Sequence, residues 1–204
     1  MLTGKHSHQN GMINNSLTFD GTQQTYPKLL QEAGYQTALI GKWHLVSDPT
    51  GFDYWNILPG QGQYYNPDFI EMGERTREEG YATTLTTDFA LNWLDGRDDT
   101  KPFCLLVHHK APHRTWMPDT THLDLFDDEN FPLPDTYFDK YEGRQAAAEQ
   151  KMSIIEDMDV VYDLKMLDYE GEIQTKYRKY FENQVGRMNQ QQREKWDSRA
   201  NSGL

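Results

Sequence analysis

Two short segments of the sequence concentrate side chains that bind anions, and each follows an apolar run. These runs, of apolar and β-forming residues, lie at residues 36–40 and 103–107. The groups are Lys42 and His44 after the first run, and His109, Lys110 and His113 after the second. Lysine offers an anion a localised positive charge, and histidine donates a hydrogen bond or transfers a proton. These residue types therefore favour a site for sulfate or phosphate.

The two segments can form one site if the apolar runs are neighbouring parallel strands. Open α/β sheets bind ligands just outside the carboxyl ends of their strands, where Lys42, His44 and His113 would then meet, with Lys110 close by. Each segment could also be an ordinary strand followed by a polar loop. A zinc site built from the histidines is a weaker interpretation, because they lack a glutamate at metalloprotease spacing.

Strands and helices alternate along the first half of the chain, which predicts an α/β fold. The expected order is a helix at residues 25–34, a strand at 36–40, strands at 52–58 and 67–73, a helix from 83 or 84 to 95, and a strand at 103–107. The apolarity of the last strand is continuous, which indicates burial on both faces. Its Cys104 is expected to be a small buried core residue.

The second half of the chain is less regular. Residues 117–139 are rich in proline and aspartate and predict a long loop on the surface. Residues 143–167 and 177–196 predict helices. Between the expected strands of the first half, two glycines alternate with Gln61 and Gln63. This loop can approach a ligand closely, although an ordinary surface loop has the same composition.

Composition excludes some classes of function. The formal net charge is −12, so a general nucleic-acid binder is disfavoured, because neutralising phosphates needs a basic face. No run approaches the roughly 18 apolar residues of a membrane span, and no signal peptide is recognisable. Read literally, such a chain stays in the cytoplasm. The single cysteine leaves the redox compartment open, and the sequence does not indicate an oligomeric state.

Four segments, in order, resemble the type I, formylglycine-dependent sulfatases. Residues 34–45, which contain Gly-Lys-Trp-His, resemble the second signature of that family. Residues 2–11 resemble the segment that follows its first signature, Cys-x-Pro-Ser-Arg. Residues 109–114 resemble a histidine-bearing loop, and residues 51–53 a related stretch. The resemblance covers about residues 1–167 and is nearest to bacterial glycan sulfatases of the N-acetylglucosamine-6-sulfatase or heparan type.

The resemblance implies an alkaline-phosphatase-like α/β fold with a mostly parallel sheet flanked by helices, and hydrolysis of a sulfate ester on a sulfated carbohydrate. In that family a calcium ion orients a formylglycine nucleophile and the sulfate. By resemblance, Lys42 contacts sulfate, His44 holds or deprotonates the formylglycine hydrate, and His113 lies near the leaving oxygen. The side chains expected to line the sugar pocket are His109, Lys110, Gln61 and Gln63. The family is usually exported to the periplasm or beyond.

The departures from the family pattern set the expected limits of this chain. It contains no Cys-x-Pro-Ser-Arg motif, so the nucleophile is absent, and the aspartate ligands of the calcium ion are not recognisable. We expect one incomplete catalytic domain with first and later strands missing, divided into residues 1–116 with the sheet and the site, 117–142 as the loop, and 143–204 as helices. Inactivity alone is expected. The alternatives are an anion-binding or sulfated-glycan-binding protein without catalysis, and a phosphoesterase or phosphonate-transferase relative.

Overall fold

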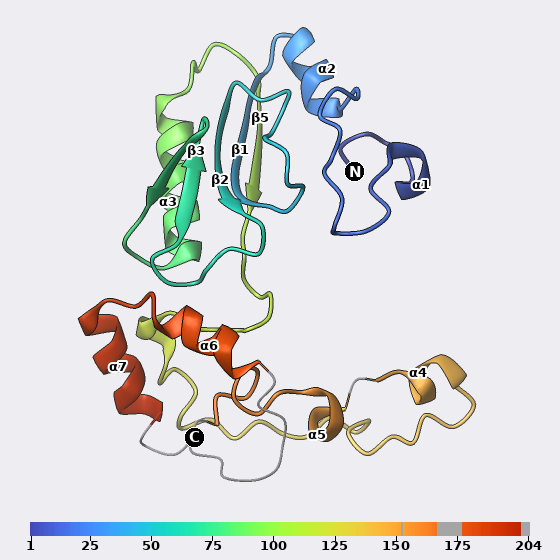
Figure 1. Ribbon diagram of the computed structural model, residues 1–204, viewed down its shortest axis with the longest axis vertical. Coiled ribbons are helices and arrows are strands. Elements are labelled where there is room, and N and C mark those ends of the chain that lie inside the picture. The colour runs from blue at the N-terminus through green and yellow to red at the C-terminus, as the bar shows by residue number, and fades with distance from the viewer. Residues whose placement is uncertain (152, 167–176, 201–204) are drawn as a thin grey trace. The chain divides into compact units, whose positions relative to one another are not determined.

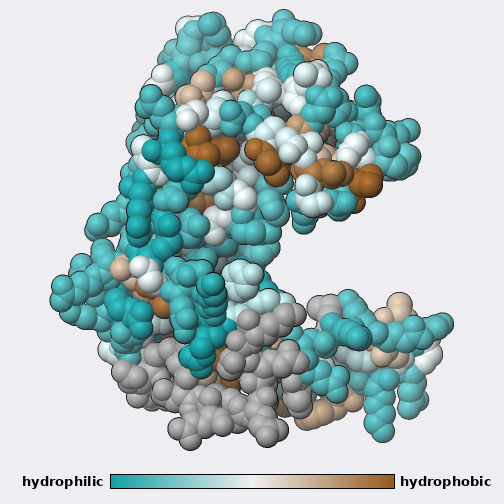
Figure 2. Space-filling view, viewed as in Figure 1, coloured by the Kyte–Doolittle hydropathy of each residue, from teal (hydrophilic) through white to brown (hydrophobic). Residues whose placement is uncertain are grey.

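A computed structural model describes residues 1–151, 153–166 and 177–200, and the chain divides into two compact units (Figure 1). We call Met1–His113 the sheet unit and Arg114–Leu204 the C-terminal unit. In the space-filling view most of the visible surface is hydrophilic (Figure 2), in keeping with a mean hydropathy of −0.88. None of the helices in the described residues is both long and apolar enough to cross a membrane.

The sheet unit contains a five-stranded sheet in the order β4-β3-β2-β1-β5 (Figure 1). The strands are β1 (Gln36–Trp43), β2 (Tyr54–Pro59), β3 (Asp68–Glu71), β4 (Glu74–Arg77) and β5 (Phe103–His108). β1 pairs in parallel with both β2 and β5, as the two-strand site requires. β3 and β4 form an antiparallel hairpin beside β2, and the exposed β4 was not predicted.

Three helices accompany the sheet: α1 (Ser7–Asn10), α2 (Tyr26–Glu32) and α3 (Ala82–Gly96). α2 packs against β1, and α3 packs against β1 and β5. The helices α2 and α3 were predicted, and Thr25 is the N-cap residue of α2, as expected. The side chain of Thr25 forms no capping hydrogen bond, and α3 begins one residue before Thr83 with Tyr81 as its N-cap. A core cluster lies between the elements and consists of Leu39, Trp43, Phe52, Trp55 and Ile57.

The strand expected to be the most deeply buried is the edge strand of the sheet. β5 pairs with β1 on one side only among the described residues, so Phe103 and Val107 are 43% and 37% exposed. Continuous apolarity was therefore a misleading sign of burial on both faces. Cys104 is half-buried, which corrects its assignment to the core, and this burial raises the pKa of its thiol.

The C-terminal unit consists of short helices joined by turns. They are the 3-10 helix η1 (Thr120–His122) and the α-helices α4 (Gln145–Glu149), α5 (Ile154–Asp157), α6 (Arg178–Val185) and α7 (Gln190–Ala200). Residues 117–139 contain no helix or strand besides η1, as expected of a loop. The helices predicted at 143–167 and 177–196 are each broken in two, and Met152 and Leu167 of the first lie outside the described residues. Phe181, Val185 and Trp196 are buried, whereas Tyr180 is exposed.

Candidate functional site

Lys42 is positioned at the carboxyl end of β1 by the residue before it. Gly41 has φ +103°, a conformation that favours glycine. A Cβ atom at Gly41 would lie 2.1 Å from the carbonyl oxygen of His108 on β5, so only glycine allows the two strands to approach this closely. The ring Nδ1 of His108 in turn lies 3.3 Å from the carbonyl oxygen of Lys42. The parallel strands therefore deliver the lysine to a defined place at the sheet edge.

Gln61, in the loop after β2, connects the charged groups of the site. The Nζ of Lys42 donates a hydrogen bond of 2.7 Å to Gln61 Oε1. The Nε2 of Gln61 lies 3.4 Å from Nδ1 of His44. The Nζ of Lys110 donates to the carbonyl oxygen of Gln61 at 2.9 Å. We call Lys42, His44, Gln61 and Lys110 the cationic patch.

Burial makes both lysines easier to deprotonate than usual, and repulsion from Lys42 adds to this effect at Lys110. Lys110 is only 5% exposed, and its ammonium lies 4.5 Å from the ring centroid of Tyr64. Burial, and then the positive charge of Lys42, lower the pKa of Lys110 to about 8. Burial also lowers the pKa of Lys42. With a pKa of about 8, Lys110 remains mainly protonated near pH 7, so it gives the patch a positive charge in a chain whose net charge is strongly negative.

The cationic patch lacks a counter-charge within the part of the chain that the structure describes. Neither Lys42 nor Lys110 forms an ion pair with a described carboxylate. Two ammonium groups drawn to one glutamine repel each other, and an anion bound between them would relieve that repulsion. Such an arrangement can bind a sulfate or phosphate group and stabilise negative charge that develops on it.

His113 lies beside the patch through its backbone. Its N–H donates to the carbonyl oxygen of Lys110 at 3.0 Å, and its own carbonyl oxygen accepts a hydrogen bond of 2.5 Å from the Tyr64 hydroxyl. Tyr64 is only 1% exposed and contacts both residues, so it fixes the turn that carries them. We did not predict this role for Tyr64. Its place among the glycines and glutamines of the same loop was the signal available in the sequence.

The other predicted site residues are not tied to the patch. His109 is exposed, Gln63 is half-buried, and neither forms a hydrogen bond to the patch among the described residues. Within the same residues, no group of three or more His, Cys, Asp or Glu side chains could hold a metal ion. The donor set therefore does not fit calcium. The only cysteine, Cys104, lies within β5, away from any Cys-x-Pro-Ser-Arg motif.

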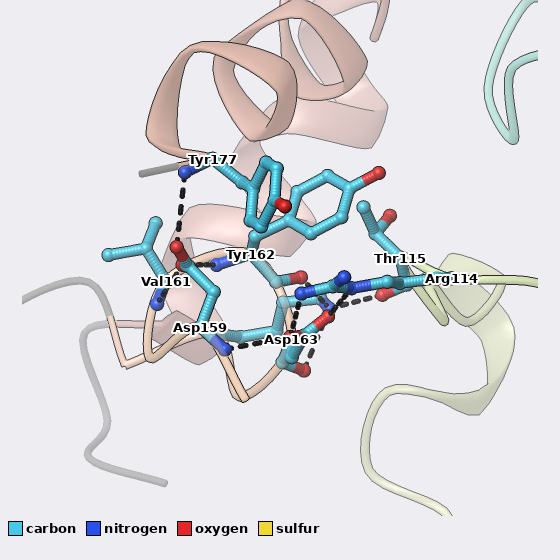
Figure 3. Close-up of polar contacts among 8 residues, drawn as sticks. Arg114, Thr115, Asp159, Val161, Tyr162, Asp163 and Tyr177 are labelled. Atoms are coloured by element: carbon cyan, nitrogen blue, oxygen red, sulfur yellow. Dashed lines mark hydrogen bonds and ion pairs between the residues drawn. The ribbon is translucent and has the colours of Figure 1, made fainter. Parts of the chain in front are cut away.

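A second polar cluster lies in the C-terminal unit, where it links separate segments of the chain by hydrogen bonds (Figure 3). Arg114 donates two hydrogen bonds of 2.5 Å to the buried carboxylate of Asp163. Asp159 accepts from the backbone N–H groups of Val161, Tyr162 and Tyr177. The guanidinium also lies 4.8 Å from the Tyr177 ring centroid. Asp163 is paired with Arg114 and Asp159 is satisfied by backbone N–H groups, so this cluster holds residues 114, 159–163 and 177 together.

Known proteins similar to this chain include several sulfatases. An N-acetylglucosamine-6-O-sulfatase of Bacteroides thetaiotaomicron is 52% identical over 202 residues, which is 97% of this chain and 36% of that relative. The human N-acetylglucosamine-6-sulfatase is 28% identical over 142 residues, which is 57% of this chain and 26% of the relative. The chain thus spans 36% and 26% of the lengths of these two curated relatives.

Solved structures agree in fold. One, described as a complex with its substrate D-glucosamine-2-N,6-O-disulfate, superimposes with a TM-score of 0.86 at 52% identity and covers 97% of this chain and 41% of that chain. The resemblance inferred from the four sequence segments and the expected α/β fold are confirmed. The sulfatase family model matches residues 1–197, and this chain belongs to the sulfatase family.

Proposed function

We propose that this chain forms part of the sulfate-binding site of a sulfatase that removes the 6-O-sulfate of glucosamine residues. Sulfatases are sulfuric ester hydrolases. The single observation that carries the proposal is that Lys42 and Lys110 both donate hydrogen bonds to Gln61, while neither lysine forms an ion pair among the described residues. The choice of sugar is supported by the relative named for N-acetylglucosamine 6-O-sulfate and by the solved complex with glucosamine disulfate.

The proposed roles follow the position of each side chain. Lys42 binds the sulfate group, and His44 binds the nucleophile or removes its proton. His113, which is exposed beside the patch, gives a proton to the leaving sugar oxygen. Lys110 adds positive charge next to Lys42. The sugar is contacted by Gln61, Gln63 and His109.

The nucleophile and the metal are assigned to the part of a sulfatase that lies outside this chain. The family's formylglycine and calcium would supply attack on sulfur and orientation of the sulfate. Neither has a matching motif or ligand group in the described residues, so we propose that this chain alone does not hydrolyse sulfate esters. A non-catalytic role in binding sulfated glycans is the second candidate, because the cationic patch is present while the nucleophile motif is absent.

A location outside the cytoplasm is part of the proposal. Among the relatives, one from Caenorhabditis elegans is named a putative extracellular sulfatase. A sulfated carbohydrate is the proposed partner. Nucleic acid is not, because the net charge of −12 opposes phosphate binding outside the local patch.

Thermal unfolding with and without sulfate tests the anion site in the full chain. Sodium sulfate should raise the melting temperature more than sodium chloride of equal ionic strength, since an anion that binds only the folded state stabilises it. N-acetylglucosamine 6-sulfate should act at lower concentration than N-acetylglucosamine. The double variant Lys42→Ala, His113→Ala should lose both effects. Identical melting with and without sulfate would overturn the proposal.

Catalysis is tested in two steps. The purified chain with calcium should release no 4-methylumbelliferone from its sulfate ester, and turnover would disprove the assignment of the nucleophile elsewhere. A chimera in which this chain replaces the matched 202-residue segment of the Bacteroides relative should be active. In that chimera Lys42→Ala should reduce kcat/KM at least about 100-fold, the usual loss for a group that stabilises transition-state charge. An unchanged kcat/KM would favour the binding-only candidate.

A further inference from the structure

We infer that Gln61 is a positioning residue that holds Lys42 and fixes His44 as the tautomer with its proton on Nε2. The placement of the side chain carries this inference. Gln61 follows β2. Its side-chain amide lies between Lys42, at the end of β1, and His44, just after it. The inference deepens the proposed function, and only its catalytic meaning rests on that function.

Donor and acceptor chemistry determines which way the amide faces. An ammonium group has donors only, so the atom of Gln61 that lies 2.7 Å from Lys42 Nζ must be the carbonyl oxygen. The NH₂ group then faces His44. Because an amide NH₂ only donates, Nδ1 of His44 must accept, and a neutral imidazole that accepts at Nδ1 carries its proton on Nε2.

This tautomer selects between the two roles open to His44. A neutral ring with Nε2–H donates a hydrogen bond from the nitrogen that does not face Gln61, and it has no free lone pair there. In the resting state His44 would therefore hold an oxygen of the nucleophile or of the sulfate by donating to it. It would not remove a proton through Nε2. The lysine, through one glutamine, thus determines what the histidine can do.

The peptide backbone supports the loop in this position. The carbonyl oxygen of Gln61 accepts from Lys110, so the residue contacts both lysines and the histidine. Gly62 has φ +64°, and a Cβ there would lie 2.3 Å from Cδ2 of Leu58, so glycine lets the loop return closely over β2. The side chain of Gln61 is itself exposed, which makes substitution possible without disturbing the core.

Nitrogen-15 NMR of the full chain with labelled histidines tests the inference without any enzyme activity. At about pH 8, where an ordinary histidine is neutral, the ring nitrogens of His44 report the tautomer directly. The signals are assigned by their loss in His44→Gln. Wild type should be almost entirely Nε2–H. Gln61→Leu should raise the Nδ1–H fraction about fivefold, the effect of one hydrogen bond.

Gln61→Glu gives the sharper result. A carboxylate only accepts, so the oxygen that faces His44 requires a proton on Nδ1, and the Nδ1–H form should become dominant. Gln63→Leu is the matched control in the same loop and should leave the His44 tautomer as in wild type. A wild-type Nδ1–H ring, or the same tautomer ratio in wild type, Gln61→Leu and Gln61→Glu, would overturn the inference.

The two proposals fail in distinguishable ways. Sulfate protection in thermal unfolding tests the anion site and depends on Lys42. The tautomer is measured in the absence of sulfate and depends on Gln61. Loss of protection with the expected tautomers would reject the proposed function and keep the positioning role. Normal protection with unchanged tautomers would do the reverse.

Discussion

Substitution of Gly41 by alanine should strongly destabilise the sheet unit. The new Cβ would lie 2.1 Å from the carbonyl oxygen of His108, about 1.3 Å closer than the 3.4 Å at which ordinary contact begins. The strands pair at this point, with Gly41 opposite His108 in register. Opening β1 and β5 by that distance breaks their hydrogen bonds here, since these weaken steeply beyond ordinary lengths.

The magnitude follows from two contributions. An L-residue in a left-handed conformation costs about 1–2 kcal/mol, and Gly41 has φ +103°. One or two lost ladder hydrogen bonds add about 1 kcal/mol each. The total of about 3 kcal/mol corresponds to a fall in melting temperature of about 10 °C for a chain of this size. Because Lys42 is the next residue, protection by sulfate should also be lost.

Gly34→Ala separates the two contributions. Gly34 has φ +88°, but nothing lies within 4 Å of the position that a Cβ atom would take there, so this variant carries the backbone strain without the clash. Circular dichroism melts of both variants should show a loss of about 1 kcal/mol for Gly34→Ala and about three times that for Gly41→Ala. Equal losses would refute the argument that the close approach of the strands requires glycine. Retained sulfate protection in Gly41→Ala would refute its link to the site.

Three further predictions concern the buried charges of Lys110 and Asp163. Because Lys110 must be protonated to attract an anion and its pKa is lowered to about 8, sulfate protection should decline between about pH 7 and 9, and Lys110→Met should remove that dependence in thermal melts. Without sulfate the sign reverses: the unfolded lysine keeps its proton up to its ordinary pKa of 10.5, so the contribution of Lys110 to stability rises as pH increases from about 8 to 10.5. Asp163→Asn should destabilise the C-terminal unit by about 3 kcal/mol in urea unfolding, since it removes a buried carboxylate that accepts two hydrogen bonds from Arg114, whereas exposed Asp197→Asn should cost under about 1 kcal/mol.

The sequence predicted the elements that carry strong local signals. Pro27 and Gly34 bracket a helix, and the two apolar runs are parallel neighbours, which is the condition that the two-strand site required. The burial of β5 could not be predicted, because residue types do not reveal whether a strand has one neighbour or two. The exposed β4 has no apolar pattern, so its residue types did not indicate that it pairs with β3.

The sequence indicated the charged side chains of the candidate site but not the hydrogen bonds that join them. Lys42, His44 and Lys110 stand out because cations after apolar runs are unusual in an acidic chain. Gln61 was expected to contact a sugar, but its contacts with the lysines and the histidine depend on how a glycine-containing loop returns over β2. The role of Tyr64 likewise depends on the folded structure, because its buried hydroxyl donates to the carbonyl oxygen of His113, which is distant in sequence.

The position of Gly-Lys-Trp-His explains why one tetrapeptide can serve both core and site. Alternation along the strand places Trp43 in the core cluster, where it is 6% exposed, while its neighbours Lys42 and His44 stay half-buried. The indole also donates a hydrogen bond of 2.6 Å to the carbonyl oxygen of Ser47, which fixes the chain beyond His44. A rigid aromatic anchor between two reactive groups limits their movement, so the geometry of the proposed anion site is determined largely by packing on the opposite side of the strand.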